Sequence, residues 1–198
     1  MNDRPILFTP ENAQKCHDGS KTQTRRTNGL QYVNEYPDDF ELIAQHDGLY
    51  HFTREGTGVG GAVRCPYGTV GDRLWVREGL ERHGSICRYR RDRKVIAPHH
   101  VWEWQRDTLS PIHMPKWACR TWLAITEIRV KRLQDISEED AKAEGCEGHR
   151  ASDGYDIDPF HDVDAREEYK LLWESIKGAG SWDANPWVWC LTFKRVQP

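Results

Sequence analysis

Apolar residues near the C-terminal end of the chain follow two periods, which predict a helix and then a strand. The positions i, i+3, i+4 and i+7 of a helical face are taken by Tyr169, Leu172, Trp173 and Ile176. A capping box over residues 164–167 begins this helix, and the glycines at 178 and 180 end it. The next apolar residues, Trp187, Trp189, Leu191 and Phe193, occupy every second position. This alternation indicates a strand over 187–195 with one face in the core.

Cap and turn residues predict the other regular elements. Thr9 and Pro10 are the N-cap and first residue of a helix that ends at Gly19. The remaining predicted elements are a strand over 5–8, a polar strand or extended loop over 20–26, a hairpin over 40–52 that turns at Asp47 and Gly48, a strand over 74–77, a long strand over 121–133, and a short helix that follows Ser137 and ends at Gly145. Strands scattered among a few helices favour an α+β barrel over a doubly wound sheet.

Length and composition indicate one globular unit. The 198 residues fit a single domain, and 9 Trp, 7 Tyr and 5 Phe are too many aromatics for a disordered chain. No apolar run approaches the roughly 18 residues of a membrane span, and the first residues lack a signal peptide, so we expect a cytoplasmic protein. The six cysteines are scattered without a C-x-x-C motif, which indicates reduced thiols. The spacing of His99, His100, His113 and Cys119 matches no zinc pattern, so we expect neither metal nor cofactor.

Charge is distributed unevenly along the chain. The formal net charge is −3, but residues 82–94 hold six basic residues against one acid, and residues 135–168 hold thirteen acids against three bases. Both segments fit solvated faces, and the basic one also fits a surface for nucleic-acid phosphates. Charge alone does not choose between these interpretations.

A glycine-rich segment over residues 56–61 satisfies the pattern G-x-G-x-x-G. A dinucleotide site needs a hydrophobic strand before this pattern and a helix after it, and Pro66 follows soon after the last glycine. We therefore interpret the segment as a flexible loop.

Lys21, Thr24 and Arg26 form the group of neighbouring residues whose side chains are best suited to catalysis. A threonine hydroxyl becomes a nucleophile only when a nearby base takes its proton, and a lysine can serve as that base. In a regular strand, however, Lys21 and Thr24 point to opposite faces, so they converge only if the chain is irregular after Gly19. The alternative is a polar edge strand in which Arg25 and Arg26 bind phosphates.

Two further residue types have a structural and a functional interpretation. Glu144 closes the predicted short helix, where the helix dipole disfavours a carboxylate, so it is either solvated or a general acid–base or positioning group. Trp173, Trp187 and Trp189 have core periodicity. In contrast, Trp75, Trp117 and Trp182 border predicted loops, where a tryptophan beside an arginine can stack on a base.

Motifs at both ends and in the middle of the chain resemble the ASCH family of the PUA-like superfamily, specifically its phage-associated branch. The matching stretches are residues 4–8, 19–26, 65–68, 71–78, 111–118, 133–145 and 180–189. Residues 27–64, 79–108 and 146–162 are outside the pattern and are interpreted as variable insertions in a single domain over 1–198. The resemblance implies a small mixed β-barrel with flanking helices and a cleft for nucleic acid or a modified nucleoside.

Small bacterial relatives have a Lys, a Thr three residues later and a Glu in a later helix, which together hydrolyse the amide of N4-acetylcytidine. By this resemblance, Thr24 attacks the acyl carbonyl, Lys21 accepts its proton, and Glu144 positions Lys21 or protonates the leaving nitrogen. Arg26 or Arg77 is the candidate group to stabilise the developing oxyanion or to bind a phosphate. The further predicted binding residues are Arg25, Trp75 and Glu78. Those relatives are about half as long as this chain, so the insertions can alter the cleft.

The sequence leads to one principal hypothesis and two alternatives. The principal hypothesis is an amidohydrolase that acts on an N4-acylated cytosine nucleoside without metal or cofactor, in the cytoplasm of the host if the chain is phage-encoded. The first alternative is a non-catalytic module that binds RNA or DNA, with Arg25, Arg26 and the basic residues over 88–94 on phosphates. The second is a ribonuclease. No membrane partner is expected, and a monomer is favoured.

Overall fold

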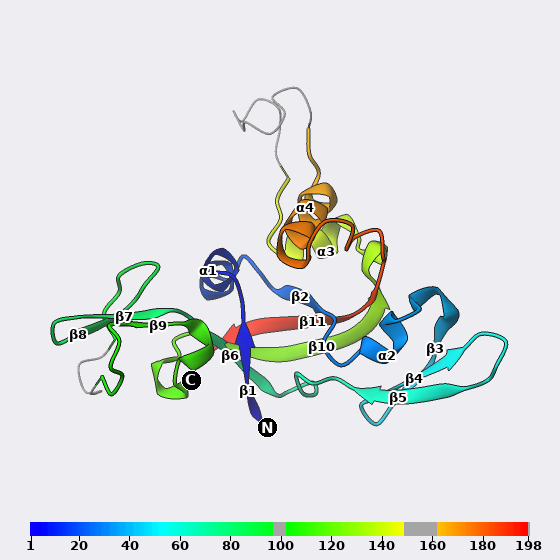
Figure 1. Cartoon of the computed structure of the whole chain (residues 1–198), viewed down its shortest axis with the longest axis horizontal. Helices are drawn as coiled ribbons and strands as arrows, with labels where there is room; N and C mark the ends of the chain where they lie inside the picture. Colours follow the sequence, from blue (N-terminus) through cyan, green and yellow to red (C-terminus); the bar gives the residue numbers. More distant parts are fainter. Residues whose placement is uncertain (97–101, 149–161, 198) are drawn as a thin grey trace.

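The computed structural model describes residues 1–96, 102–148 and 162–197 and is built around a five-stranded mixed sheet (Figure 1). Its strand order is β1-β6-β10-β11-β2, in which only β1 and β6 run parallel. The strands are β1 (Asp3–Leu7), β6 (Arg73–Arg77), β10 (Trp122–Arg132), β11 (Trp187–Val196) and β2 (Gln23–Arg26). The predicted strands at 5–8, 74–77, 121–133 and 187–195 are confirmed, and each observed strand end lies within two residues of its predicted position.

The strand β11 is buried on both faces, which explains its nearly continuous apolar sequence. Trp189, Leu191 and Phe193 pack into the main core, as their alternation predicts, and Trp187 packs partly against it. Val188 and Cys190 point to the opposite face, where they belong to a second core under two helices. Both faces of β11 therefore position the elements around the candidate site.

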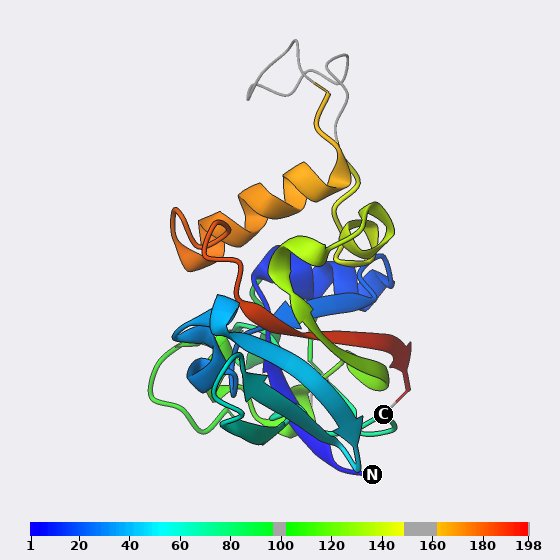
Figure 2. The same ribbon diagram turned by 90° about the vertical axis from the view of Figure 1, so that its right-hand side faces the viewer.

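Three helices lie on one side of the sheet (Figures 1 and 2). They are α1 (Pro10–Asp18), α3 (Glu138–Ala143) and α4 (Ala165–Lys177). Each begins at a predicted cap, because the side chains of Thr9, Ser137 and Asp164 accept hydrogen bonds from the backbone N–H groups of Asn12, Asp140 and Glu167. A short helix, α2 (Gln31–Asn34), lies beyond β2.

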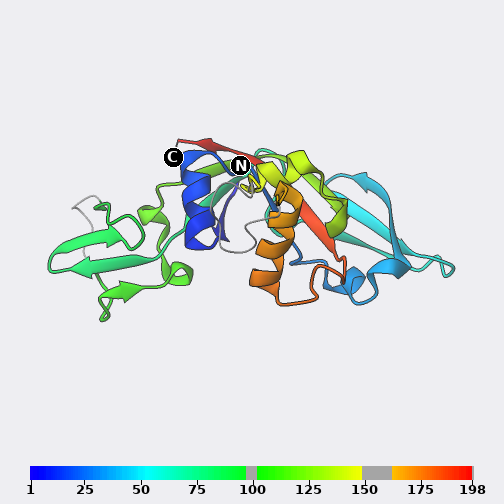
Figure 3. The same ribbon diagram turned by 90° about the horizontal axis from the view of Figure 1, so that it is seen from above.

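Two smaller sheets extend from opposite ends of the main sheet (Figure 3). One comprises β3 (Phe40–His46), β4 (Leu49–Arg54) and β5 (Gly60–Arg64), and its Tyr50 and Phe52 pack into the main core. The other comprises β7 (Leu80–His83), β8 (Ile86–Tyr89) and β9 (Thr108–Leu109), and it has its own small core. We call this second sheet the β7–β9 arm. Short 3-10 helices cover 37–39, 111–113, 116–118 and 133–135.

The predicted hairpin turn at Asp47 and Gly48 is confirmed, whereas the glycine-rich segment over 56–61 differs from its prediction. Asp47 and Gly48 both have positive φ, of 52° and 70°, as the tight turn between β3 and β4 requires. The loop predicted over 56–61 ends early, because Gly60 and Gly61 already belong to β5. A Cβ atom at Gly60 would clash with the carbonyl oxygen of Phe52, which explains the glycine in this strand.

The predicted α+β class is confirmed, but the predicted barrel is not. In the part of the chain that the structure describes, the main sheet stays open, with β1 and β2 at its edges, and the other strands form separate sheets. The segments over 27–64 and 79–108, interpreted from the sequence as insertions, contribute strands to these separate sheets and do not close the main one. Part of the third segment, over 149–161, lies outside the described residues.

Candidate active site

Lys21 and Thr24 converge because the chain is irregular before β2. Gly19 has a left-handed φ of 90° and ends α1, and the strand begins only at Gln23. Between them, the N–H of Lys21 donates to the carbonyl of Lys15, and the N–H of Thr22 donates to the carbonyl of Ala143. This is the irregularity that the sequence required for both side chains to reach one cavity, and both line the same small cavity.

Glu144 is the C-cap of α3 and is buried beside Lys21. The Lys21 ammonium donates to the carboxylate Oε2 and to the backbone carbonyl of Glu144, at 2.6 Å in each case. An ammonium at this end of the helix complements the dipole that disfavours the carboxylate. The interpretation of Glu144 as a solvated residue at a helix end is therefore wrong.

Arg25 completes this buried cluster of charges. Its guanidinium donates to Oε1 of Glu144 at 3.2 Å, to Oδ2 of Asp140 at 2.7 Å and to Oε1 of Gln23 at 2.7 Å. Asp140 and Glu144 lie four residues apart on α3, so both carboxylates reach the same guanidinium. Burial opposes ionisation of Asp140, but the hydrogen bond from Gln23 and the charges of Arg25 and Arg129 outweigh it and lower the pKa of Asp140. Three cations, Lys21, Arg25 and Arg129, thus face the two carboxylates here.

The position of Arg25 does not suit the phosphate-binding role predicted for it. Its side chain is fully buried and its guanidinium is bonded to two carboxylates, so it is not exposed at the surface where a phosphate would bind. Arg25 instead holds Glu144 in place from the side opposite Lys21.

Thr24 is also buried, and its hydroxyl accepts a hydrogen bond of 2.9 Å from Nη1 of Arg26. The other terminal nitrogen of Arg26, Nη2, donates to the carbonyl of Leu7 at the end of β1, at 2.9 Å. The guanidinium also lies 4.9 Å from the ring centroid of Phe8. These contacts fix a positive charge at the hydroxyl of Thr24.

A small cavity of about 40 Å³ unites the three predicted catalytic residues. Its lining consists of Asn12, Lys21, Thr24, Arg25, Arg26, Glu144, Tyr169, Leu172, Trp173, Ile176 and Lys177. Burial raises the pKa of Tyr169 well above its ordinary value, so its phenol stays protonated. We call this space the inner cavity.

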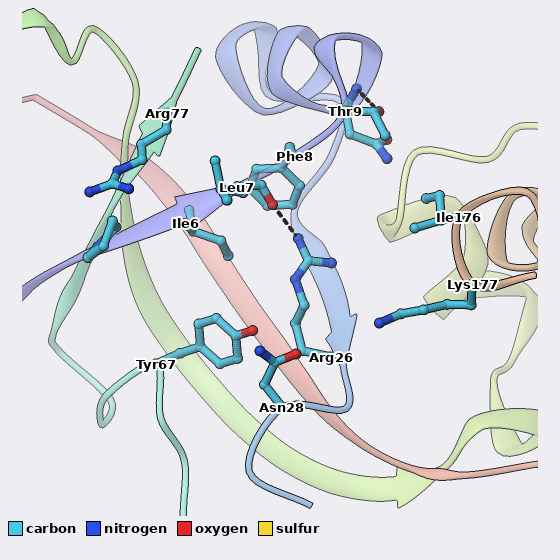
Figure 4. Close-up of a pocket in the computed structure, with 12 residues that line it drawn as sticks. Ile6, Leu7, Phe8, Thr9, Arg26, Asn28, Tyr67, Arg77, Ile176 and Lys177 are labelled. Atoms are coloured by element: carbon cyan, nitrogen blue, oxygen red, sulfur yellow. Dashed lines mark hydrogen bonds between the residues drawn. The ribbon is translucent and has the colours of Figure 1, made fainter. Parts of the chain in front are cut away.

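A larger cavity of about 490 Å³ adjoins the inner one, because Asn12, Arg26, Ile176 and Lys177 line both. Figure 4 shows Arg26 and Lys177 pointing into this cavity from different elements, with Tyr67 and Asn28 beside them. Arg77 also lines it, and among the residues that the structure describes no Asp or Glu does. Burial and the nearby charge of Arg26 lower the pKa of Lys177. We call this space the outer cavity.

Arg77 and Glu78 lie at a third cavity, of about 380 Å³, at the base of the β7–β9 arm. Arg77 lines both this arm cavity and the outer cavity, as Phe8 does. Glu78 is buried, and Arg120 donates to its two carboxylate oxygens at 2.9 and 2.6 Å. The carboxylate of Glu78 is thus already paired, whereas Arg77 remains a candidate binding residue.

The tryptophans expected to border loops are mostly core residues. Trp75 is only 6% exposed, lines none of these three cavities, and has the Arg77 guanidinium 4.6 Å from its ring centroid. Trp182 is also buried, whereas Trp117 is 40% exposed. The predicted role of Trp75 in base stacking therefore finds no open ring face, because the strand β6 turns it into the protein.

Four residues of the site were not predicted as site residues from the sequence: Asp140, Gln23, Tyr169 and Lys177. Asp140 had a detectable signal, since it precedes Glu144 by one helical turn. Gln23 also had one, since it lies two residues before Arg25 and shares its face of the strand. Lys177 had a weaker one, as a basic residue in the last turn of α4. Tyr169 had none, because only the three-dimensional fold brings it to Arg25.

Comparisons with models of protein families, with curated proteins and with solved structures found no match to this chain. All six cysteines are free thiols. Among the described residues no group of three His, Cys, Asp or Glu side chains is placed to hold a metal ion, while His99 and His100 lie outside them. Within the same residues no helix is long and apolar enough to cross a membrane.

Proposed function

We propose that this protein is an amidohydrolase of the ASCH type that removes the acyl group from an N4-acylated cytosine nucleoside. The observation that carries the proposal is the shared inner cavity, which Thr24 lines together with the buried pair of Lys21 and Glu144. The motif resemblance assigns the chemistry, and the pairing of Lys21 with Glu144 and of Thr24 with Arg26 supports it.

The first half of the reaction transfers the acyl group to the protein. Oγ1 of Thr24 attacks the acyl carbonyl, and its proton goes to Lys21, which has passed a proton to Glu144 along their hydrogen bond. Glu144 returns that proton to N4 as the C–N bond breaks, so free cytidine leaves and an ester remains on Thr24. Water then attacks the ester through the same groups and releases the carboxylic acid.

Arg26 is the group best placed to stabilise the oxyanion. Nη1 of Arg26 already lies 2.9 Å from Oγ1 of Thr24, next to the carbon that the hydroxyl would attack. Preorganised donors aimed at a developing negative charge lower the barrier by about 3–4 kcal/mol each. The bond from Arg26 to the carbonyl of Leu7 keeps the guanidinium in this orientation.

The test is a chromatographic assay of purified protein with N4-acetylcytidine in the presence of a chelator. Conversion to cytidine by the wild type, and none by Lys21→Ala, Thr24→Ala or Glu144→Ala, supports the enzyme and its three roles. A folded wild type without conversion contradicts the proposal.

A second candidate function is a non-catalytic module that binds RNA or DNA. The observation that favours it is the outer cavity, which is lined by Arg26, Arg77 and Lys177 and, in the described part of the chain, by no carboxylate. Such a binder loses affinity steeply as salt increases, whereas turnover of a neutral nucleoside is nearly insensitive to salt. A salt titration with fluorescent RNA and DNA oligonucleotides separates the two functions.

A further inference from the structure

The arm cavity lies next to the outer cavity. Phe8 and Arg77 line both spaces, so these two side chains are where the cavities meet. The far side of the arm cavity is formed by Gly79, Arg90, Arg91 and Pro111. Gly79, Arg90 and Arg91 belong to residues 79–108, one of the segments interpreted from the sequence as insertions.

Positive charge dominates the arm cavity. Three arginines line it, at positions 77, 90 and 91, and the one carboxylate among its described lining residues, Glu78, is already held by Arg120. Arg91 has one exposed partner, Glu11, at 2.9 Å. Exposed pairs of this kind contribute little and exchange readily for another anion. Arg90 forms no ion pair with any residue in the described part of the chain.

Two of the three arginines are held in position by the fold. Nη1 of Arg77 donates to the carbonyl of Ile112 at 2.7 Å, and its guanidinium lies over the ring of Trp75. The side chain of Arg90 packs on Gly79, where an added Cβ would lie 3.2 Å from its Cδ. The N–H of Arg90 also donates to the carbonyl of Gly79, which fixes the start of that side chain. Guanidinium groups are suited to phosphate, because each presents a planar set of N–H donors to its oxygens.

We propose that the substrate carries a phosphate ester on its ribose and that this phosphate binds in the arm cavity at Arg77, Arg90 and Arg91. This inference rests on the proposed function, since it places the acylated base in the outer cavity with the acyl group at Thr24. A free nucleotide and a nucleotide within single-stranded RNA share this chemistry. The neutral nucleoside is then a truncated substrate that forgoes the contacts with the arm cavity.

The experiment compares four substrates: N4-acetylcytidine, its 5′-monophosphate, its 3′-monophosphate and a short single-stranded RNA with one N4-acetylcytidine. We expect kcat/KM for at least one phosphorylated substrate to exceed that for the nucleoside by about tenfold or more at low salt, because each charge-assisted hydrogen bond contributes about 1.5–3 kcal/mol. Preference for a monophosphate indicates a free nucleotide, and preference for the RNA indicates a polynucleotide. Equal kcat/KM for all four substrates overturns the proposal.

A double variant, Arg90→Gln with Arg91→Gln, tests the location of the phosphate. We expect it to remove most of the advantage of the phosphorylated substrate and to leave the nucleoside unaffected. The matched control is Arg82→Gln, because Arg82 lies on the same arm, pairs with Asp107 and lines none of the three cavities. If the double variant behaves like Arg82→Gln, the phosphate does not bind in the arm cavity.

A binding measurement separates failure of this inference from failure of the proposed function. Calorimetry with cytidine 5′-monophosphate and 3′-monophosphate requires no turnover. If the wild type hydrolyses no substrate but binds a monophosphate, and the double variant binds it at least about tenfold more weakly, the amidohydrolase is wrong and the phosphate site stands. If the nucleoside is hydrolysed but neither the phosphate nor the double variant changes kcat/KM, the amidohydrolase stands and the phosphate site is wrong.

Discussion

Two charged clusters in the described part of this protein each join an arginine to two carboxylates, but only one of them has the features of an active site. In the first, Arg25 holds Asp140 and Glu144, and Lys21 adds a second cation. In the second, Arg120 holds Glu78 and Asp92 and lies 3.8 Å from the ring centroid of Tyr89.

The difference lies in what adjoins the charges. The guanidinium of Arg120 donates to the carboxylates of Glu78 and Asp92, and this cluster attaches the β7–β9 arm to the main sheet. The first cluster shares a cavity with the hydroxyl of Thr24 and with Arg26. Ion pairs alone therefore indicate a structural role. Catalysis is indicated only when a nucleophile and space for a substrate lie next to them.

The largest expected effect comes from breaking the first cluster. Lys21→Met or Glu144→Gln leaves a buried group without its partner, which costs about 3–5 kcal/mol of folding free energy. We also expect kcat to fall by about a hundredfold to ten-thousandfold, because the proton path is lost. Chemical denaturation gives the stability, and turnover per folded molecule gives the catalytic effect.

Asp92→Asn is the matched change in the second cluster. It weakens one hydrogen bond, of 2.6 Å, to Arg120, and we expect a cost of about 1–3 kcal/mol with unchanged kcat. If the folded Lys21→Met variant turns over N4-acetylcytidine as fast as Asp92→Asn does, the contrast between the clusters is wrong.

A smaller effect is expected from the size of the inner cavity. Its volume of about 40 Å³ suits a short acyl group, so kcat/KM of the wild type should fall by about tenfold or more from acetyl to butyryl. Leu172→Ala enlarges the cavity and should narrow this gap. The control is Leu171→Ala, because Leu171 is exposed on the same helix. Identical acyl preferences in the two variants would exclude the inner cavity as the acyl site.

The smallest effect concerns a surface cluster, in which Arg73 and Lys116 both bind Asp3. Their hydrogen bonds lower the pKa of Asp3 from 3.8 to about 2. A lowered pKa in the folded state gives stability that is present above the unfolded pKa and is lost as the pH falls through the folded value. Thermal unfolding should therefore show Asp3→Asn to be less stable than the wild type at pH 6, with the difference shrinking between about pH 4 and pH 2. A difference that is constant over this range would contradict the pKa shift.

The local elements were predictable because their signals are local. Thr9, Ser137 and Asp164 cap helices by their own side chains, and the alternation from Trp187 to Phe193 needs only a buried face. The separate sheets were not predictable, because pairing of β3–β5 and of β7–β9 depends on which strands meet in space. The barrel prediction was wrong for this reason, since strand count alone does not determine closure.

The residue types of the candidate site were predictable, but the contacts between their side chains were not. The motif singled out Lys21, Thr24 and Glu144, and the sequence also stated the irregularity that lets the first two converge. It gave Arg25 and Trp75 exposed roles, whereas tertiary packing buries both. Neighbouring positions in a strand face opposite sides, so Arg26 faces the cavities and Arg25 faces α3.

The most direct test of the central claim, that Thr24 is the nucleophile of an amidohydrolase, is kcat/KM for N4-acetylcytidine measured with the wild type, Thr24→Ser and Thr24→Val. Valine keeps the shape of threonine and removes only the hydroxyl. The account predicts turnover by the wild type, turnover within about tenfold by Thr24→Ser, and a loss of at least about a thousandfold in a folded Thr24→Val. Turnover by Thr24→Val at the wild-type rate, or none by the folded wild type, would contradict it.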